Sequence, residues 1–304
     1  MLKRIRNIAF FNKLIRNLVK ALLQKLQRLT FKWRVSGEVP IRFRDKKIFF
    51  YTQSDDGIAD ALFYERDYIE FPELNLFSQL AERSGTIVDI GANTGLYSII
   101  SAFFNPTASI IAFEPNASNI KRLKKNIDLN HLKNIQVVEQ AAGDTVGNVS
   151  FTVPEGDVIS DTSSVLPDFS KATYQGTIQW KEVSVPQTSL NDFFKGYSGK
   201  VDLVKIDVEG YEMNVFQGAG EFFKAHTPVI LCEIFLDDEK KKFFSEFLST
   251  HQYFAYLVLK DGLLRLDEGL IPNYDGLNFL FSKKKASLIY SSFKNIRQIA
   301  EELL

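Results

Sequence analysis

The sequence predicts an α/β fold in which a parallel, doubly wound sheet carries helices on both faces. Three observations support this prediction. Short apolar segments alternate with helix-like segments between residues 86 and 250. A glycine-rich turn, from Gly91 to Gly95, joins the first of these strands to a helix. The 304 residues are 45% hydrophobic and 24% charged, which is typical of a globular chain and excludes wholesale disorder.

The elements follow in chain order from hydrophobic periodicity. Strands are expected at residues 39–43, 47–51, 86–90, 109–114, 135–140, 149–153, 178–185, 201–206 and 228–235, and strands at 255–259 and 277–282 can close the sheet. Helices are expected over 67–83, up to 104, over 117–130, from 188 to 194, from 211 and over 237–250. Ligands of such sheets bind where the parallel strands end. Residues that follow the strands are therefore the first candidates for a site.

A basic segment opens the chain. Residues 1–34 contain ten Lys and Arg residues and no acidic residue, although the formal net charge of the whole chain is zero. Apolar residues recur there at helical spacing, which predicts an amphipathic basic helix. Such a helix can attach to an anionic membrane surface, or it can pack on its own domain or on a partner subunit. Nucleic acid is a weaker third option, and no nucleic-acid partner is expected, because no recognisable nucleic-acid module follows.

The expected organisation has four parts. They are the basic arm (1–34), a strand and helix region (35–85), the core domain (86–284) and a C-terminal helix (285–304). The longest apolar runs are only a few residues, so no membrane-spanning helix is expected. Cys232 is the only cysteine, which excludes an internal disulfide and a cysteine-based zinc cluster. The arm also lacks the features of a secretory signal. The expected location is the cytoplasm, either free or peripheral on a membrane.

The glycine turn and the next strand suggest a nucleoside cofactor. Gly91 and Gly95 are expected to let a ligand approach the backbone, and Glu114 at the end of the second strand can accept both hydroxyl hydrogens of a ribose. The spacing is G-x-x-x-G, with Asn93 where a dinucleotide site has its second glycine. Asp89 repels a pyrophosphate but suits a cationic amino group. The turn therefore favours S-adenosylmethionine (SAM), and an NAD oxidoreductase is a distant alternative.

At this point the sequence resembles the FkbM family of SAM-dependent methyltransferases. The resemblance covers roughly residues 65–282, and its most specific part is the stretch from Lys205 to Glu212. The other matching segments are Tyr68 to Glu73, Asp89 to Gly95, Phe113-Glu114-Pro115, Ala141 to Asp144, and Glu233. The family implies a class I methyltransferase fold, a Rossmann-like, mostly parallel sheet of seven strands with an antiparallel last strand. It also implies methylation of hydroxyl groups on sugars and natural products.

The resemblance assigns residues to the cofactor. Asp89, Gly91, Asn93 and Gly95 would line the amino-acid end of SAM, and Glu114 would hold the ribose. The other residues assigned to the cofactor are Asn116 near the ribose, Asp144 at the adenine amino group, and Glu70, Ala92 and Ala142 within the same motifs.

Carboxylates are better placed for catalysis than the three histidines. Asp207 ends the fourth core strand, Glu209 follows it, and Glu233 lies near the end of the fifth. Adjacent parallel strands bring these side chains into one cleft, where burial raises the pKa of a general base. Alternatively, two or three of them hold a divalent cation that activates an acceptor hydroxyl. No residue is assigned to a metal.

The acceptor is expected to be a small molecule or glycan. The polar insertion at residues 154–177 contains the run Ser160 to Ser164, which can contact a sugar-like acceptor, although a solvated loop explains it equally well. The leading hypothesis is O-methylation of a hydroxyl on a sugar, glycan, glycolipid or related natural product. The alternatives are methylation of an amine or carboxylate, and a catalytically silent nucleotide-binding module attached to membranes.

Overall fold

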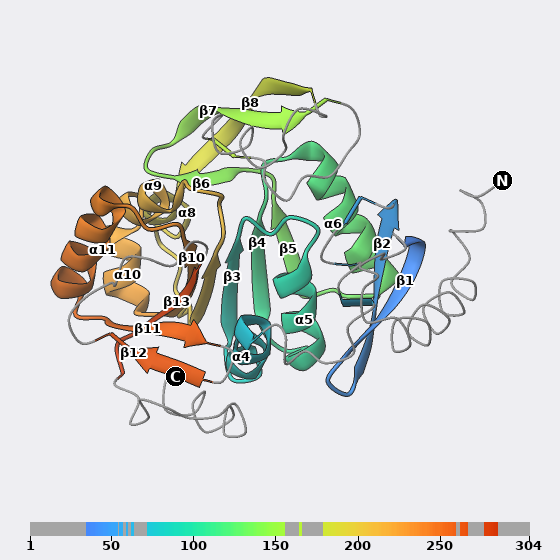
Figure 1. Ribbon diagram of the computed structural model, residues 1–304, viewed down its shortest axis with the longest axis horizontal. Helices are drawn as coiled ribbons and strands as arrows, with labels where there is room; N and C mark the ends of the chain where they lie inside the picture. Colours follow the sequence, from blue (N-terminus) through green and yellow to red (C-terminus); the bar gives the residue numbers. More distant parts are fainter. Residues whose placement is uncertain are drawn as a thin grey trace, which may run out of the picture.

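The computed structural model describes residues 35–53, 55–56, 59, 62–63, 72–155, 164–165, 179–259, 262–266 and 277–284. Figure 1 shows a central sheet flanked by helices, with two smaller sheets at its periphery. The strands are β1 (Ser36–Phe43), β2 (Lys46–Gln53), β3 (Thr86–Ile90), β4 (Ser109–Phe113), β5 (Ile135–Val138), β6 (Ala141–Gly143), β7 (Gly147–Pro154), β8 (Trp180–Ser189), β9 (Leu203–Ile206), β10 (Val229–Ile234), β11 (Phe254–Leu259), β12 (Gly262–Arg265) and β13 (Leu277–Ser282). The helices are α4 (Pro72–Ala81), α5 (Leu96–Phe104), α6 (Ala117–Leu129), α8 (Leu190–Phe193), α9 (Glu212–Gln217), α10 (Gly220–His226) and α11 (Asp238–His251).

The central sheet confirms the predicted parallel core. Its strand order in the described residues is β12-β11-β13-β10-β9-β3-β4-β5. Strands β5, β4, β3, β9 and β10 pair in parallel, and β13 is antiparallel to both β10 and β11. The antiparallel last strand is therefore present, but the expected seven strands are one too few. The eighth is β12, which pairs antiparallel with β11 at the edge. Its four residues are too short to show an alternating pattern, and the only sequence signal is the Asp261-Gly262 dipeptide before it.

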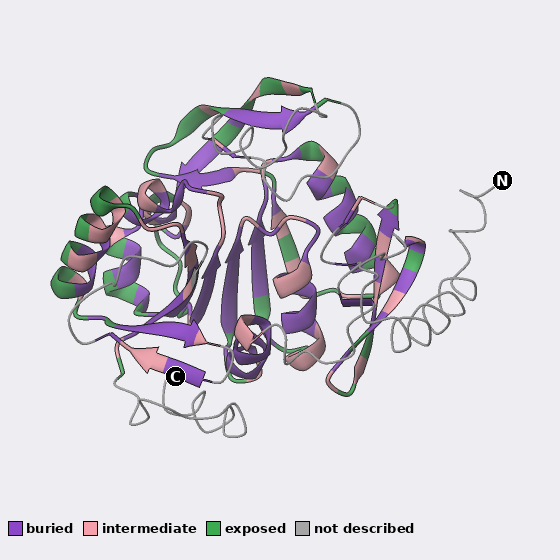
Figure 2. Ribbon diagram, viewed as in Figure 1, coloured by how far each residue is buried: buried purple, intermediate pink, exposed green. Residues whose placement is uncertain are grey.

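Helices cover both faces of this sheet, as the doubly wound prediction requires. Alternate strand residues point to opposite faces. Ile87 of β3 belongs to a buried cluster with side chains of α4 and α5, whereas its neighbour Val88 belongs to a cluster with side chains of α8, α9, α10 and α11. Helix α6 packs beside α5, where Leu123 and Ile99 share a third cluster. Figure 2 shows that the central strands are buried over most of their length.

Local hydrogen bonds determine where several helices begin. The Asn116 side chain accepts from the backbone N–H of Ser118 at the start of α6. The Ser189 side chain accepts from the N–H of Asp192 and begins α8, within the helix expected from 188 to 194. Asp237 accepts from the N–H of Lys240 and begins α11. These short polar side chains are preferred at such positions because they satisfy N–H groups that have no partner in the helix.

Two smaller sheets complete the described structure. Strands β6, β8 and β7 form a sheet beside the ends of β4 and β5. The strands expected at 149–153 and 178–185 are confirmed as β7 and β8, but the three-residue β6 was not expected. The β1–β2 hairpin is held on α6, where Asn126 accepts from the Tyr51 N–H at 2.8 Å. Arg122 of α6 also forms a two-pronged ion pair with Asp55, at 3.0 and 3.1 Å.

Several expectations lie outside the described residues. They are the basic arm at 1–34, the C-terminal helix at 285–304, the helix expected before residue 72, most of the insertion at 154–177, and the candidate Glu70. Within the part of the chain that the structure describes, no helix is long and apolar enough to cross a bilayer.

Candidate active site

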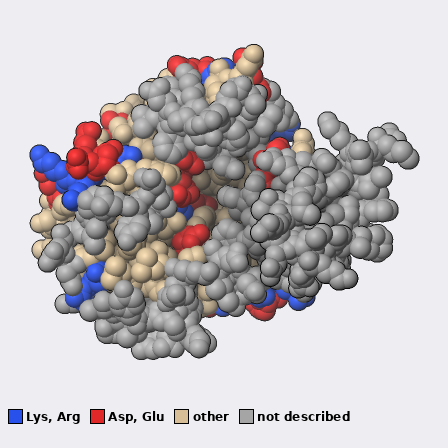
Figure 3. All heavy atoms as spheres, in the orientation of Figure 1, with Lys and Arg blue, Asp and Glu red and all other residues tan. Residues whose placement is uncertain are grey.

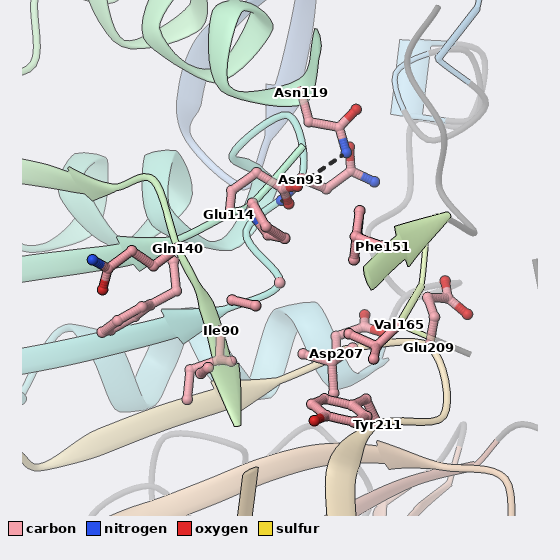
Figure 4. Close-up of a pocket in the computed structure, with 16 residues that line it drawn as sticks. Ile90, Asn93, Glu114, Asn119, Gln140, Phe151, Val165, Asp207, Glu209 and Tyr211 are labelled. Atoms are coloured by element: carbon pink, nitrogen blue, oxygen red, sulfur yellow. Dashed lines mark hydrogen bonds between the residues drawn. The ribbon is translucent and has the colours of Figure 1, made fainter. Parts of the chain in front are cut away.

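The carboxyl ends of β3, β4 and β9 open into a cavity of about 500 Å³. Gly91, Glu114 and Asp207 line it from the central sheet, and Phe151 of β7 and Tyr211 before α9 line it from the sides. Figure 4 shows the side chains of Glu114, Phe151, Asp207 and Tyr211 around this cavity, each from a different element. Its position at the carboxyl ends of parallel strands agrees with the general rule for such sheets.

Gly91 lies where two loops meet. Its φ is +79°, and a Cβ built on it would lie 1.8 Å from the backbone oxygen of Asp207. The N–H groups of Gly91 and Ala92 both donate to the Phe113 carbonyl, which fixes the turn against β4. The sequence predicts a close approach of ligand to this glycine. Gly91 does line the cavity, but the closest approach is made by the protein itself, at the end of β9.

We expect Gly91→Ala to destabilise the protein by more than about 3 kcal/mol, because its Cβ overlaps backbone atoms and the positive φ is strained. Urea unfolding followed by circular dichroism measures this. Gly220→Ala is the matched control, since a Cβ there meets nothing within 4 Å. Equal stability of the two variants would contradict this account of the turn.

The other turn residues serve mainly to build it. Gly95 precedes α5 with a φ of +96°, and a Cβ there would lie 2.3 Å from Leu123 of α6. Gly95 is thus required by helix packing, and it is not among the residues that line the cavity. Ala92 is buried and also lies away from the cavity. Asn93 does line it, with a φ of +50° that directs its backbone N–H to Glu114.

Glu114 is a buried carboxylate at the edge of the cavity. One oxygen accepts from the Asn93 N–H at 2.8 Å, and the other accepts from the Asn116 N–H at 2.8 Å and the Asn119 amide at 3.5 Å. Figure 4 shows Asn119 directed at this carboxylate. Burial raises the pKa of Glu114 to about 7, against these hydrogen bonds, which lower it. Two oxygens offer about four acceptor positions, so Glu114 retains capacity for hydroxyl donors.

Asp89 lies behind the turn and not at the cavity wall. It is 2% exposed, and one oxygen accepts from both the backbone N–H and the hydroxyl of Ser98, at 3.0 and 2.6 Å. Ser98 is in the first turn of α5, so Asp89 ties β3 to the start of that helix. Burial raises the pKa of Asp89 to about 6, while Ser98 and Lys205 lower it. Asp89 is not among the residues that line the cavity, and its expected contact with an amino group stays a prediction.

The remaining cofactor candidates lie at different distances from the cavity lining. Ala142 lines the cavity from β6. Asn116 caps α6 and donates its N–H to Glu114, so it acts through that carboxylate. Asp144 is exposed beyond β6, where it accepts from the side-chain amide of Gln187 at 3.3 Å, and it does not line the cavity. Glu70 is outside the described residues.

Asp207 lines the cavity on one side and borders a cluster of acidic side chains on the other. Lys205 of β9 donates to an Asp207 carboxylate oxygen at 3.2 Å. The lysine side chain is 1% exposed and that of Asp207 is 32% exposed, so the lysine lies beneath a carboxylate that reaches the surface of the site. Figure 3 shows acidic side chains gathered around a hollow near the middle of the face in view.

Glu233 lies next to Asp207 across the sheet. Cys232 pairs with Ile206 in the parallel register, which places Glu233 one residue further, level with Asp207. Burial and the neighbouring charge of Asp207 raise the pKa of Glu233 to about 7, against Lys205, which lowers it. Glu73, at the start of α4, carries a pKa that is likewise raised by burial. The structure thus brings Asp207 and Glu233 together, as the strand order predicts.

Glu209 lines the cavity from the loop after β9, with a φ of +53°. Its backbone oxygen accepts from the Ser164 hydroxyl at 2.7 Å. The carbonyl of Ser164 in turn accepts from the Thr152 N–H of β7 at 2.8 Å, and the adjacent Val165 lines the cavity. Two residues of the insertion are therefore held between β7 and the loop that carries Asp207 and Glu209.

Sequence reasoning missed several residues of the site. Phe151, Val165 and Tyr211 supply apolar wall, and Asn119 contacts Glu114. The sequence analysis ranks residues that directly follow the parallel strands, whereas these residues lie on other elements. Lys205 belongs to a matching segment of the family resemblance, which implies no role for it. In the described part of the chain, no three His, Cys, Asp or Glu side chains gather as a metal site, so the divalent-cation alternative gains no support.

Comparisons with known proteins agree with this geometry. A family model described as "Methyltransferase FkbM domain" matches residues 89–261, more than half of the chain. Methyltransferase sdnD from Sordaria araneosa is 28% identical over 158 residues, covering 44% of this chain and 60% of that protein. Hexuronic acid methyltransferase AglP from Haloferax volcanii is 26% identical over 147 residues, covering 48% of this chain and 54% of that protein. The chain therefore spans little more than half of the length of either relative.

Among solved structures, a methyltransferase FkbM from Methylobacillus flagellatus KT is similar, with 15% identity and a TM-score of 0.44. The match covers 75% of this chain and 55% of the other.

Proposed function

The chain belongs to the FkbM methyltransferase family, whose members use SAM, and from this premise we propose that it methylates a hydroxyl group. The acceptor class is a sugar, a glycan, a glycolipid or a related natural product. The observation that carries the proposal is the position of Asp207, which lines the cavity and lies beside Glu233. A hydroxyl acceptor must lose its proton near the transition state, and a carboxylate beside the cavity can take it.

The cavity suits SAM in its donors, acceptors and apolar wall. Glu114 would accept the ribose hydroxyls, one at the unused acceptor position of its Oε2 and the other in place of the 3.5 Å bond from Asn119 to its Oε1. Phe151, Val165 and Tyr211 offer flat or branched apolar surface against which the adenine ring of SAM would pack. Gly91 and Asn93 would border the amino-acid end. Asp89 contributes by holding α5 in place, and Asn116 by orienting Glu114.

Asp207, Glu209 and Glu233 would each have a different role in methyl transfer. Bound SAM supplies a methyl group on a positively charged sulfur. Asp207, held by Lys205, would accept a hydrogen bond from the acceptor and orient it. Glu233 would accept the proton that the hydroxyl loses, because its pKa of about 7 is close to the working pH. Glu209, at the rim of the cavity, would contact the acceptor.

The comparisons also favour a sugar acceptor, without distinguishing its hydroxyl groups from a carboxylate. One similar protein is named a hexuronic acid methyltransferase. An amine or carboxylate acceptor remains the alternative within the same enzyme class, because such groups need no strong base. The basic segment at 1–34 would bring the enzyme to an anionic membrane surface, where glycolipid acceptors are made.

The test has two steps. First, the melting temperature is measured with SAM, S-adenosylhomocysteine and NAD; a ligand at 100 times its Kd adds roughly 2.7 kcal/mol of stability. We expect a shift with the first two ligands only. Second, methyl-labelled SAM is incubated with panels of sugars, glycans and glycolipids, and the products are treated with alkali. An alkali-stable product on an acceptor without amino groups is an ether and supports the proposal. An alkali-labile product is an ester and favours a carboxylate acceptor, and a shift with NAD alone would overturn the proposal.

A further inference from the structure

Lys205 is an unusual residue for the middle of a parallel sheet. It belongs to β9, between β3 and β10, and its side chain is 1% exposed. A buried ammonium group is costly unless it is paired and hydrogen-bonded. Its Nζ donates to Asp207 at 3.2 Å and to the Ile206 carbonyl at 3.3 Å, and lies 5.1 Å from the centre of the Tyr97 ring.

Acidic side chains lie near Lys205 on several elements. In the register of the sheet, Lys205 lies directly opposite Asp89 of β3. The titratable groups that interact with it or its carboxylate partners come from β3, α4, α5, β9, α9 and β10, and they are Asp89, Glu73, Tyr97, Asp207, Glu212, Cys232 and Glu233. Several carboxylates therefore share Lys205 as a cation, and Glu212 among them also lies 3.9 Å from Lys240. These carboxylates include the two that the proposed function assigns to the acceptor.

We propose that Lys205 is a positioning residue for methyl transfer: an internal cation that orients Asp207 toward the cavity and balances the carboxylate cluster so that Glu233 can act as the base. This inference rests on the proposed function. The hydrogen bond fixes one Asp207 oxygen on the lysine and leaves the other for an acceptor hydroxyl. The positive charge also opposes the repulsion between Asp207 and Glu233.

The decisive variant is Lys205→Met, which keeps the length of the side chain and removes its charge. Without the cation, Glu233 binds its proton more tightly, because Asp207 and Glu73 still raise its pKa and Lys205 no longer lowers it. We expect the titration midpoint of the Glu233 carboxyl, followed by NMR with ¹³C-labelled glutamate, to rise by about one pH unit or more. The acid limb of the kcat pH profile should move upward with it, so that activity partly recovers at high pH.

Two further variants make the test robust. Lys240→Met is the control, since this lysine is also mostly buried and lies 3.9 Å from a carboxylate, that of Glu212, yet outside the cavity wall. Its Glu233 midpoint should match the wild type. If Lys205→Met does not fold, Lys205→Gln takes its place, because glutamine keeps a donor for Asp207 but carries no charge.

The possible outcomes separate this inference from the proposed function. An unchanged Glu233 midpoint in a folded Lys205 variant overturns the inference, whatever the enzyme methylates. A loss of activity that is equal at all pH values also overturns it, because a merely structural role predicts that result. A raised midpoint in a protein that methylates no hydroxyl supports the role of Lys205 as the balancing cation and overturns the function built on it.

Discussion

Glu233→Gln is expected to lower kcat by roughly 10²- to 10⁴-fold, the usual contribution of a general base. Glutamine has nearly the same shape but cannot take a proton. Affinity for SAM should change by less than about threefold, since Glu233 is not among the residues that line the cavity. Steady-state kinetics with a confirmed acceptor, together with calorimetric titration of SAM, measure the two effects separately.

The pH profile adds a second readout for the same variant. In the wild type, kcat/KM should rise as the pH passes through about 7, because Glu233 must lose its proton to act as a base. The variant should lose this dependence. Glu246→Gln, on the exposed face of α11, is the control. If Glu233→Gln keeps full turnover, the base is another group, and Asp207→Asn becomes the next variant to measure.

Glu114→Gln is expected to weaken SAM binding by about 100-fold, with smaller effects on the fold. Hydrogen bonds to a charged acceptor contribute about 1.5–3 kcal/mol each, and glutamine keeps one acceptor oxygen, so the loss of about one such bond is expected. The new amide also turns an N–H toward the N–H of Asn93 or Asn116, which now donate to the carboxylate. Calorimetric titration with S-adenosylhomocysteine gives the affinity directly.

The pH dependence of binding identifies the group responsible. Burial raises the pKa of Glu114 to about 7, so the wild type should bind SAM best above that pH and lose affinity as protonation removes an acceptor. Glu114→Gln should show a flatter dependence between about pH 6.5 and 8.5. Glu139→Gln, at an exposed carboxylate paired with Lys124, should bind as the wild type does. Unchanged affinity in Glu114→Gln would remove the ribose assignment.

The sequence predicted the core of the fold well, since the parallel strands are short, apolar and separated by amphipathic helices. Strand β3 was predicted with the residue bounds that the structure gives it. Glu114 and Glu233 could be found because they follow or end strands whose carboxyl ends share one edge. Such positional reasoning needs only strand ends, and those are marked in the sequence by the change from apolar to polar residues.

The parts that could not be predicted depend on contacts across the fold. Nothing local shows that the atom nearest to the missing Cβ of Gly91 is the Asp207 oxygen, 116 positions away in the chain. Nor does the sequence show that Ser98 donates to Asp89. Lys205 lies in an apolar strand, and nothing local reveals that several carboxylates surround it. Charge balance in a core is a property of the assembled sheet.

The bond from Ser164 to Glu209 has a consequence for engineering the enzyme. Ser164 and Val165 are held between β7 and the β9 loop, and Val165 lines the cavity. A loop graft that exchanges residues 154–177 for those of a relative would replace this part of the wall together with the polar run. Keeping the Ser164-Val165 pair as a fixed anchor separates the two, so that chimeras can vary the proposed acceptor loop while the cavity keeps its lining.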